Sequence, residues 1–339
     1  MRTGDSPILP VIFRPALPVA GRRHARERRL ADRLEKYMTK NGFRVRIGHP
    51  KTLSEAVEMA REAGRSSPLV VAAGGDGTIN AVATGIMDTG CCLGILPLGS
   101  GNDLARGLHI PKNLSGAVRL LRSGYELLTG GPETGKVRSG TILRNMDTGR
   151  IASMESPEPD PVLPSTPHRF LNTLGIGFDG EVAWNASQMR MNGGMMKYMR
   201  GVIRSLFTYQ ATGMTVTADG ETISGRFLMA TVANGPFEGS GIPVAPDADP
   251  TDGFFNLILI RDADTLSRLL LFIRVLFSGT SEGGLILIRK CRNVHISTSL
   301  PVMVHADGEM ISARMNGLSA VIQPASLTVI GGQPTRMRM

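Results

Sequence analysis

The stretch LVVAAGGDGTINAVATGIM, residues 69–87, decides the fold of this chain. Its first five residues are apolar and typical of a buried strand, and they lead directly into a glycine-rich turn at 74–78. Apolar side chains then recur at helical spacing from Ile79 to Ile86. The stretch therefore predicts a strand, a tight glycine turn and a helix.

The turn itself favours an anionic ligand. Its glycines let a ligand approach bare backbone, and the following helix directs its unpaired N–H groups and the positive end of its dipole at the same point. Asp76 would repel an anion unless a cation lay between them, and Mg²⁺ bridging Asp76 to a phosphate removes that conflict. The turn is neither a G-x-G-x-x-G fingerprint nor a P-loop. The alternative is an Asp-Gly turn that binds nothing.

Composition limits the classes of protein that fit. The chain has 339 residues, enough for two domains, and 42% hydrophobic with 20% charged residues is typical of a folded globular protein. The net charge of +9 favours an anionic partner: a nucleotide, a nucleic acid or an acidic membrane surface. Only 5% of residues are aromatic and no basic stripe interleaved with aromatics occurs, which argues against nucleic acid.

The compartment follows from cysteines and apolar runs. Three cysteines form no disulfide framework and no C-x-x-C pair, so we expect a reducing environment. Pro10, Arg14 and Pro15 interrupt the region where a signal peptide would need its apolar core, and Arg274 breaks the longest apolar run, 269–277. We therefore expect no membrane span.

The first part of the chain alternates between strands and helices. The predicted strands are 8–13, 43–47, 69–73 and 91–96, and helices are expected from about Arg22, from Thr52 with a capping box to Glu55, after the glycine turn, and over 114–122 with Gly124 as its stop. This alternation predicts an open α/β sheet that binds its ligand at the carboxyl ends of the strands. The polar loop PLGSGNDLAR, 97–106, follows one such strand and suits that edge.

The composition of the chain and its predicted secondary structure change after residue 129. Residues 129–168 are rich in Gly, Pro, Ser and Thr, and we expect an exposed, mobile proline-rich insert at about 145–168. Short strands follow, with an Asp219-Gly220 hairpin signal; they are expected at 170–176, 214–218, 226–233, 254–260, 285–288, 294–297, 302–305 and 318–322, with helices at 197–209 and 265–277. The pattern predicts a mostly antiparallel β-sandwich domain.

Two acidic segments lie in this part. Asp247, Asp249 and Asp252 fall within six positions of a proline-bent loop, which could hold a hard cation or be a plain turn. In HADGE, 305–309, Asp307 or Glu309 could accept a proton from a substrate hydroxyl, although an Asp-Gly hairpin turn would explain the glycine equally well.

Taken together, the motifs resemble a known family. GGDGTIN (74–80), LPLGSGNDLAR (96–106), FLNTLGIGFDGEVA (170–183), ANGPFEGSGIPVAPDADPTDGFFNLILI (233–260) and HADGE (305–309) are similar to the diacylglycerol kinase catalytic-domain family, most closely its soluble bacterial lipid kinases, and extend to sphingosine and ceramide kinases. GGDG alone is weak evidence for this family, since NAD kinases and phosphofructokinases also carry it, but the combination of these motifs is specific to the family. The resemblance covers most of the chain.

The resemblance implies a fold and an activity. The fold is α/β plus all-β: an NAD-kinase-like nucleotide-binding domain at 1–125, completed by 312–335, and a β-sandwich lipid-substrate domain at 126–311, with the active site in the cleft between them. The implied activity is ATP-dependent transfer of the γ-phosphoryl group to a hydroxyl of diacylglycerol or a related glycerolipid or sphingolipid. The alternative is a homologue that binds nucleotide or lipid as a regulator; retention of Asp76 and Glu309 favours the enzyme.

The resemblance also implies roles for residues. Glu309 would be the general base, with Asp307 as the second choice; Asp76 would act through Mg²⁺; and Asp252 with the carbonyls of Asp249 and Phe254 would hold a structural Mg²⁺. The implied nucleotide-binding set is Thr52, Gly74, Gly75, Asp76, Gly77, Thr78, Asn80, Gly99, Ser100, Asn102 and Asp103.

A lipid substrate gives the basic residues a purpose. Arginines crowd the first turns of the helix from Arg22, where they oppose the helix dipole, so they are either a solvated face or contacts to phosphate or lipid headgroups. We expect a cytoplasmic protein peripheral to the inner face of an anionic membrane, which could form a homodimer. Its candidate headgroup contacts are Arg22, Arg23, Arg26, Arg106, Arg190 and Lys197. The helix at 269–277 could line a lipid slot or serve core packing.

Two departures from the family pattern stand out. Arg14-Pro15 occupies the place of an Asn-Pro pair after the first strand. Arg138, in VRSG at 137–140, is aligned with the Asp of a Val-Asp-Leu-Gly pattern, and its charge would alter the metal network.

Overall fold

The computed structural model describes residues 8–14, 23–130, 141–156, 169–188 and 194–333. The chain divides into two compact units, one formed by 1–146 with 326–339 and the other by 147–325. Among the expected features, Pro15, Arg22, Arg138 and Arg190 lie outside the described residues, as does the proline-rich run 157–168. Each unit is described by itself.

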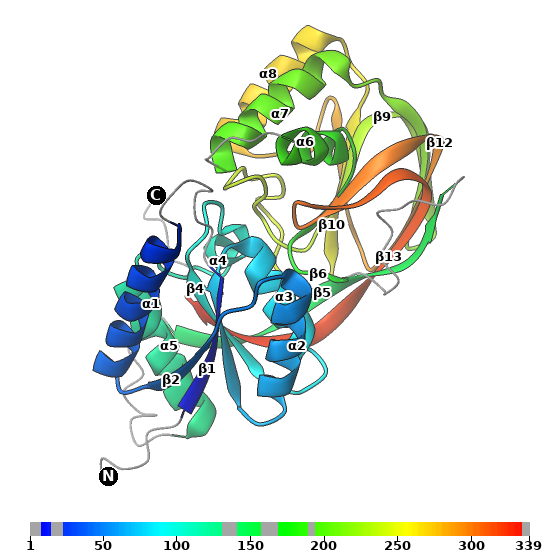
Figure 1. The fold of residues 1–339 in the computed structure, drawn as a ribbon. Helices are drawn as coiled ribbons and strands as arrows, with labels where there is room; N and C mark the ends of the chain where they lie inside the picture. The colour runs from blue at the N-terminus through cyan, green and yellow to red at the C-terminus, as the bar shows by residue number, and fades with distance from the viewer. Residues whose placement is uncertain (1–7, 15–22, 131–140, 157–168, 189–193, 334–339) are drawn as a thin grey trace. The chain divides into compact units, whose positions relative to one another are not determined.

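The first unit is built on a parallel sheet. Its order is β13-β4-β3-β1-β2, and the strands are β1 (Ile8–Arg14), β2 (Arg44–Gly48), β3 (Leu69–Gly74), β4 (Cys92–Pro97) and the end of β13 (Glu309–Gly332), where Val329 pairs with Leu93. Figure 1 shows helices on both sides of this sheet: α1 (Arg23–Lys40) and α5 (Leu114–Thr129) on one, α2 (Leu53–Gly64) and α3 (Asp76–Ile86) on the other. The short α4 (Asp103–Gly107) follows β4.

Continuous apolar sequence explains the central strands. Every residue of β3 and β4 is buried, as a parallel sheet covered on both faces requires. The four strands expected in this region are confirmed to within one or two residues. Thr52 caps α2 as its sequence predicted, because its side chain accepts the backbone N–H of Glu55 at 3.1 Å.

One helix boundary was predicted wrongly. Helix α5 continues through Gly124 to Thr129, and Gly130, with φ +63°, provides the left-handed cap. Gly124 instead serves packing, since a Cβ there would lie 2.5 Å from the Ile330 side chain of β13. A glycine required by a neighbouring strand was mistaken for a stop signal.

The second unit is mostly antiparallel. Its order is β11-β10-β9-β7-β12-β13, with β8 paired to β9 and β12, and β5 paired to β13 and β6. The bounds are β5 (Thr141–Glu155), β6 (Arg169–Phe170), β7 (Thr173–Gly177), β8 (Thr212–Ala218), β9 (Glu221–Ala233), β10 (Phe255–Arg261), β11 (Ile286–Cys291) and β12 (Asn293–Ala306), with helices α6 (Phe178–Ser187), α7 (Gly194–Thr208) and α8 (Thr265–Ser278). Phe170 stacks on Phe255 within its core, with ring centroids 5.5 Å apart.

The hairpin predicted at Asp219-Gly220 is confirmed. Both residues have positive φ, +45° and +93°, as a two-residue type I′ turn between β8 and β9 requires. The two strands expected at 294–297 and 302–305 are parts of β12, whose register shifts between Ser297 and Val302. Helix α6 was not predicted; its Gly180 packs so closely on β12 that a Cβ would lie 2.2 Å from the Met303 carbonyl.

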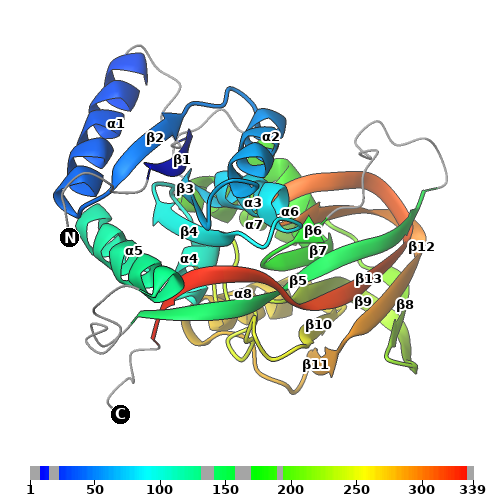
Figure 2. The ribbon, with the colours of Figure 1, turned by 90° about the horizontal axis from the view of Figure 1, so that it is seen from below.

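Part of the expected mobile insert is a strand. Residues 145–155 belong to β5, which lies beside β13 in Figure 2. Met146, Asp147 and Thr148 are buried there, so strand pairing and burial outweigh the unfavourable strand propensity of Asp147 and Gly149. No helix in the described ranges is long and apolar enough to span a membrane.

Candidate functional site

The glycine turn and the SGND loop meet at the carboxyl edge of the parallel sheet. Gly74 ends β3 opposite Pro97, which ends β4, and Arg14 at the end of β1 pairs with Gly74. A Cβ on Gly99 would lie 2.4 Å from the Gly75 Cα. These two glycines are therefore required by the contact between the loops.

Asp76 joins the two loops electrostatically. Its Oδ2 accepts the backbone N–H of Asn102 at 2.7 Å and its Oδ1 accepts that of Asp103 at 2.8 Å. Burial raises the pKa of Asp76, while these two hydrogen bonds act in the opposite direction. Carboxylate oxygens are among the ligands that suit Mg²⁺ and its bound waters.

Other predicted nucleotide residues have visible tasks. The Thr78 hydroxyl is buried and donates to the Arg14 carbonyl at 3.0 Å, tying α3 to β1. Asn102 adopts the left-handed conformation, φ +54°, and its side chain bonds both the N–H and the carbonyl of Gly99 at 2.9 and 2.8 Å. Ser100 is exposed beside them, and Gly75 offers α3 no capping side chain. The loop is thus shaped by its own contacts and leaves the helix start for a ligand.

An open cavity of about 760 Å³ lies at the ends of β1 and β2. Its lining includes Arg14, His49 and Lys51, which adjoins the exposed Thr52 at the start of α2. The acids Glu27, Asp32 and Glu35 from α1 line the opposite side. The cavity can receive a ligand with both anionic and hydrogen-bond-donating groups.

The DGE segment of the second unit is a tight hairpin turn. Ala306 pairs with Glu309, and the two residues between them have positive φ, +50° at Asp307 and +81° at Gly308. The Asp307 carboxylate accepts the N–H groups of Leu171, Asn172 and Thr173 at 2.8, 2.8 and 2.9 Å. Asp307 therefore fixes the turn on the segment that enters β7, whereas Glu309 is exposed.

The acidic loop 247–254 has mixed pairing. Asp249 Oδ1 accepts the N–H and hydroxyl of Thr251, and the Asp252 N–H donates to the Asp249 carbonyl at 3.3 Å. Asp252 accepts the Phe254 N–H at 3.0 Å and pairs with the Lys290 ammonium at 2.5 Å. Carboxylate and carbonyl oxygens suit a hard cation, although Lys290 already neutralises Asp252.

Asp147 was missed by sequence reasoning. This buried carboxylate accepts the N–H groups of Gly253 and Ala325 at 2.7 and 2.8 Å, so it supports the acidic loop from below. Met146–Gly149 reads Met-Asp-Thr-Gly, which fits the Val-Asp-Leu-Gly pattern better than residues 137–140. The signal was present, nine positions beyond the one that was aligned.

A second missed feature is a buried ionisable cluster. His305 Nε2 lies 2.9 Å from Glu238 Oε1 and 3.4 Å from Asp179 Oδ2, which also accepts the Thr231 hydroxyl at 3.2 Å. Burial, and then the charge of Asp179, raise the pKa of Glu238 to about 7. All three residues lie inside motifs of the family resemblance, 170–183, 233–260 and 305–309, but nothing in the sequence marks them as neighbours.

Helices α7 and α8 share an exposed apolar face. They contact one another, as Figure 1 shows, and on them the side chains of Phe207 and Phe277 are 70% and 81% exposed; the other exposed apolar residues are Met196, Ile203, Leu266, Leu269, Leu270 and Ile273. We call this set the α7/α8 face. Neither helix contains an acidic residue, and Arg200, Arg204 and Arg274 are exposed on them.

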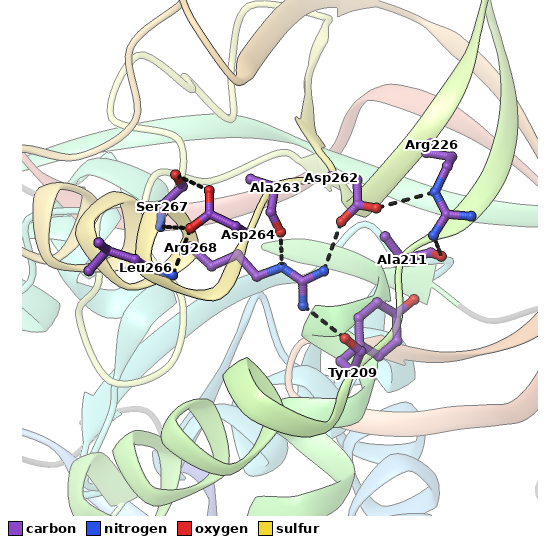
Figure 3. Close-up of polar contacts among 9 residues, drawn as sticks. All are labelled: Tyr209, Ala211, Arg226, Asp262, Ala263, Asp264, Leu266, Ser267 and Arg268. Atoms are coloured by element: carbon purple, nitrogen blue, oxygen red, sulfur yellow. Dashed lines mark hydrogen bonds and ion pairs between the residues drawn. The ribbon is translucent and has the colours of Figure 1, made fainter.

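Arg268 locks the start of α8 to the end of α7. Figure 3 shows its guanidinium donating to the carbonyls of Tyr209 and Ala263 and to Asp262, each at 2.8 Å. Burial would raise the pKa of Asp262, but hydrogen bonds from Arg268 and Arg226 hold it below its ordinary value. Beneath the helices an apolar cavity of about 60 Å³ is lined by Phe178, Val202, Leu228 and Phe272.

Comparisons with known proteins agree with this architecture. Residues 17–127 match the diacylglycerol kinase catalytic domain, and residues 172–331 match the YegS C-terminal NAD kinase beta sandwich-like domain. A diacylglycerol kinase of Bacillus subtilis (strain 168) is 25% identical over 296 residues, 86% of this chain and 87% of its own; one of Mycobacterium tuberculosis (strain H37Rv) is 26% identical over 275 residues, 80% and 79%. The crystal structure of a diacylglycerol kinase from Bacillus anthracis Sterne superposes with a TM-score of 0.66 at 18% identity, covering 96% of each chain.

Proposed function

Because the chain belongs to the diacylglycerol kinase family of lipid kinases, we propose that it transfers the γ-phosphoryl group of ATP to a hydroxyl of a membrane lipid, diacylglycerol or a related glycerolipid or sphingolipid. The observation that carries this proposal is that both matched domains retain their acidic motifs, GGDG with Asp76 and DGE with Glu309. The first unit is the nucleotide-binding domain and the second the lipid-substrate domain.

The nucleotide phosphates bind at the start of α3. This proposal is supported by the absence of a capping side chain at Gly75 and by the cavity beside Thr52 and Lys51 at the same sheet edge. When bound, Mg²⁺ neutralises phosphate charge during transfer. Asp76 would hold it through water, while its bonds to Asn102 and Asp103 keep the loop in place.

Glu309 is the general base that accepts the proton of the lipid hydroxyl. The contacts of Asp307 support this choice, because its carboxylate already accepts three backbone N–H groups. The exposed Glu309, next but one on the same rigid turn, is the carboxylate that a substrate can reach. A structural Mg²⁺ at Asp252 would have to share that carboxylate with Lys290.

The protein reaches its substrate at the inner face of an anionic membrane, as a cytoplasmic peripheral protein. The α7/α8 face supports this: large apolar side chains insert at the headgroup boundary while Arg200, Arg204 and Arg274 contact anionic lipid. The side chains of Arg22, Arg23 and Arg26 lie outside the described residues, and Arg106 donates to the Gly101 carbonyl at 3.5 Å. The α7/α8 face is therefore the better supported contact.

The test is a phosphotransfer assay in mixed micelles. The protein is supplied with ATP and Mg²⁺ and with diacylglycerol, phosphatidylglycerol, a sphingoid base or ceramide, and phosphorylated lipid is measured. We expect one class to be phosphorylated well above the others. Tight nucleotide or lipid binding without turnover on any lipid would favour a regulatory homologue instead.

A further inference from the structure

The proposed reaction gives no task to the buried cluster of Asp179, Glu238 and His305. Each side chain is at least nine-tenths buried, and the three come from α6, the segment after β9, and β12. His305 Nε2 lies within hydrogen-bonding distance of Glu238 Oε1, and Glu238 also shares a side-chain hydrogen bond with Asp179. Burying three ionisable groups is costly unless a shared proton or a bound metal ion compensates their charges.

The hydrogen bond of the other ring nitrogen of His305 distinguishes a shared proton from a metal ion in this cluster. His305 Nδ1 accepts the backbone N–H of Gly308 at 3.2 Å, so Nδ1 carries a lone pair and the ring proton lies on Nε2, facing both carboxylates. A metal ion on Nε2 would leave the ring with no proton at all. Metal-bound histidines instead donate their second N–H to an acceptor. The geometry fits a proton rather than a metal ion.

The surrounding backbone is built to make room for this contact. A Cβ on Gly175 of β7 would lie 2.2 Å from His305 Nε2 and 2.4 Å from Asp179 Oδ2. Glu238 is held by two backbone hydrogen bonds with Ile242, at 2.9 and 2.8 Å. The cluster is therefore a specific arrangement.

The link to catalysis is Gly308, which lies between Asp307 and Glu309 at the tip of the turn. We propose that His305, held by Glu238 and Asp179 through a proton rather than a metal ion, is a positioning residue for Glu309. Asp307 anchors one side of the turn and His305 the other. This inference rests on the proposed function of Glu309.

The cluster also makes the turn sensitive to pH. The titratable groups facing the imidazole are Asp179 from α6 and Glu238 from the segment after β9; β7 and β9 contribute only Gly175 and Thr231. Burial lowers the pKa of His305, but the charges of Glu238 and Asp179 outweigh it and raise that pKa well above its ordinary value. A second proton, on Nδ1, would replace the lone pair and break the contact with Gly308, so the contact forms only in the singly protonated ring. The rate of turnover should therefore depend on the protonation states of Glu238 and His305.

Three variants test the proposal. In His305→Gln the amide can still donate to the carboxylates but not accept from Gly308, whereas in His305→Asn the amide oxygen occupies the Nδ1 place. We expect kcat to fall about 10-fold or more further in His305→Gln than in His305→Asn, at similar KM for ATP. Glu238→Gln should flatten the pH profile of kcat around pH 7. Equal kcat in the two His305 variants would overturn the positioning role.

Two measurements do not depend on activity. The Gly308 amide should exchange hydrogen faster in His305→Gln than in unmodified protein or Glu238→Gln, and unchanged exchange would overturn the contact. After equilibration with Zn²⁺, elemental analysis should find the same metal content in the unmodified protein and in Glu238→Gln. If the unmodified protein bound one Zn²⁺ per chain and the variant none, a metal ion rather than a proton would join the cluster. If the unmodified protein phosphorylates no lipid, the proposed function fails, while these two results still decide the cluster.

Discussion

The Asp76 carboxylate accepts the backbone N–H of Asn102 at 2.7 Å, across 26 positions of sequence. The residue expected to serve magnesium thus also holds the polar loop of the neighbouring strand in place. Structure and proposed chemistry depend on the same side chain.

Replacing Asp76 should therefore have two effects. In Asp76→Asn one oxygen becomes an N–H₂ group that faces a backbone N–H, so we expect a loss of about 1 kcal/mol in the free energy of unfolding, together with loss of phosphotransfer. Urea denaturation and the micelle assay measure them separately. A variant as stable and as active as the unmodified protein would remove Asp76 from both roles.

Gly99→Ala tests the contact between the two loops. The new methyl group would overlap the Gly75 backbone, which cannot move as a side chain does, and we expect a loss of about 2 kcal/mol. Gly225→Ala is the matched control, because its Cβ would meet only ordinary contacts from 3.4 Å. Thermal unfolding compares the two, and equal midpoints would contradict the close packing of the loops.

Glu238 should make stability depend on pH. Its pKa is about 7 in the folded protein and near the ordinary 4.5 when unfolded, so the folded state binds more protons between these values. Its contribution to the free energy of unfolding is complete below 4.5 and is lost as the pH rises through 7.

Glu238→Gln lacks this titration. Between pH 5 and pH 8 the free energy of unfolding should consequently fall less in the variant than in the unmodified protein. Urea titrations at both pH values measure the difference. Parallel pH dependence in the two proteins would show that Glu238 does not titrate in this window.

The α7/α8 face predicts membrane binding. Phe207→Ser with Phe277→Ser should leave the unfolding midpoint nearly unchanged, since both rings are exposed, but should weaken binding to vesicles containing phosphatidylglycerol. Leu300→Ser on β12, 63% exposed and outside the face, is the control. Vesicle sedimentation measures binding; an equal loss in both proteins would contradict the assignment of this face.

Local patterns predicted most of the architecture. The strand–turn–helix at 69–87, the cap at Thr52 and the hairpin at Asp219 depend on neighbours in sequence, and all three are confirmed. Gly124 and residues 145–155 were misassigned because Ile330 and strand β13, far along the chain, determine them.

The same division applies to the candidate site. Motifs identified Asp76 and the DGE turn, but the contacts that separate the roles of Asp307 and Glu309 come from residues 171–173. Glu238 meets His305 only through the sheet, so no spacing rule could have found it. Long-range pairing was the missing information in each case.

The most direct measurement is the rate of phosphate transfer from ATP to the preferred lipid by unmodified protein and by Glu309→Gln, with unfolding midpoints as the control for folding. We predict that the unmodified protein is active and that the variant, with an unchanged unfolding midpoint, has a kcat lower by about 10²-fold to 10⁴-fold. A folded Glu309→Gln variant that keeps full kcat would contradict it.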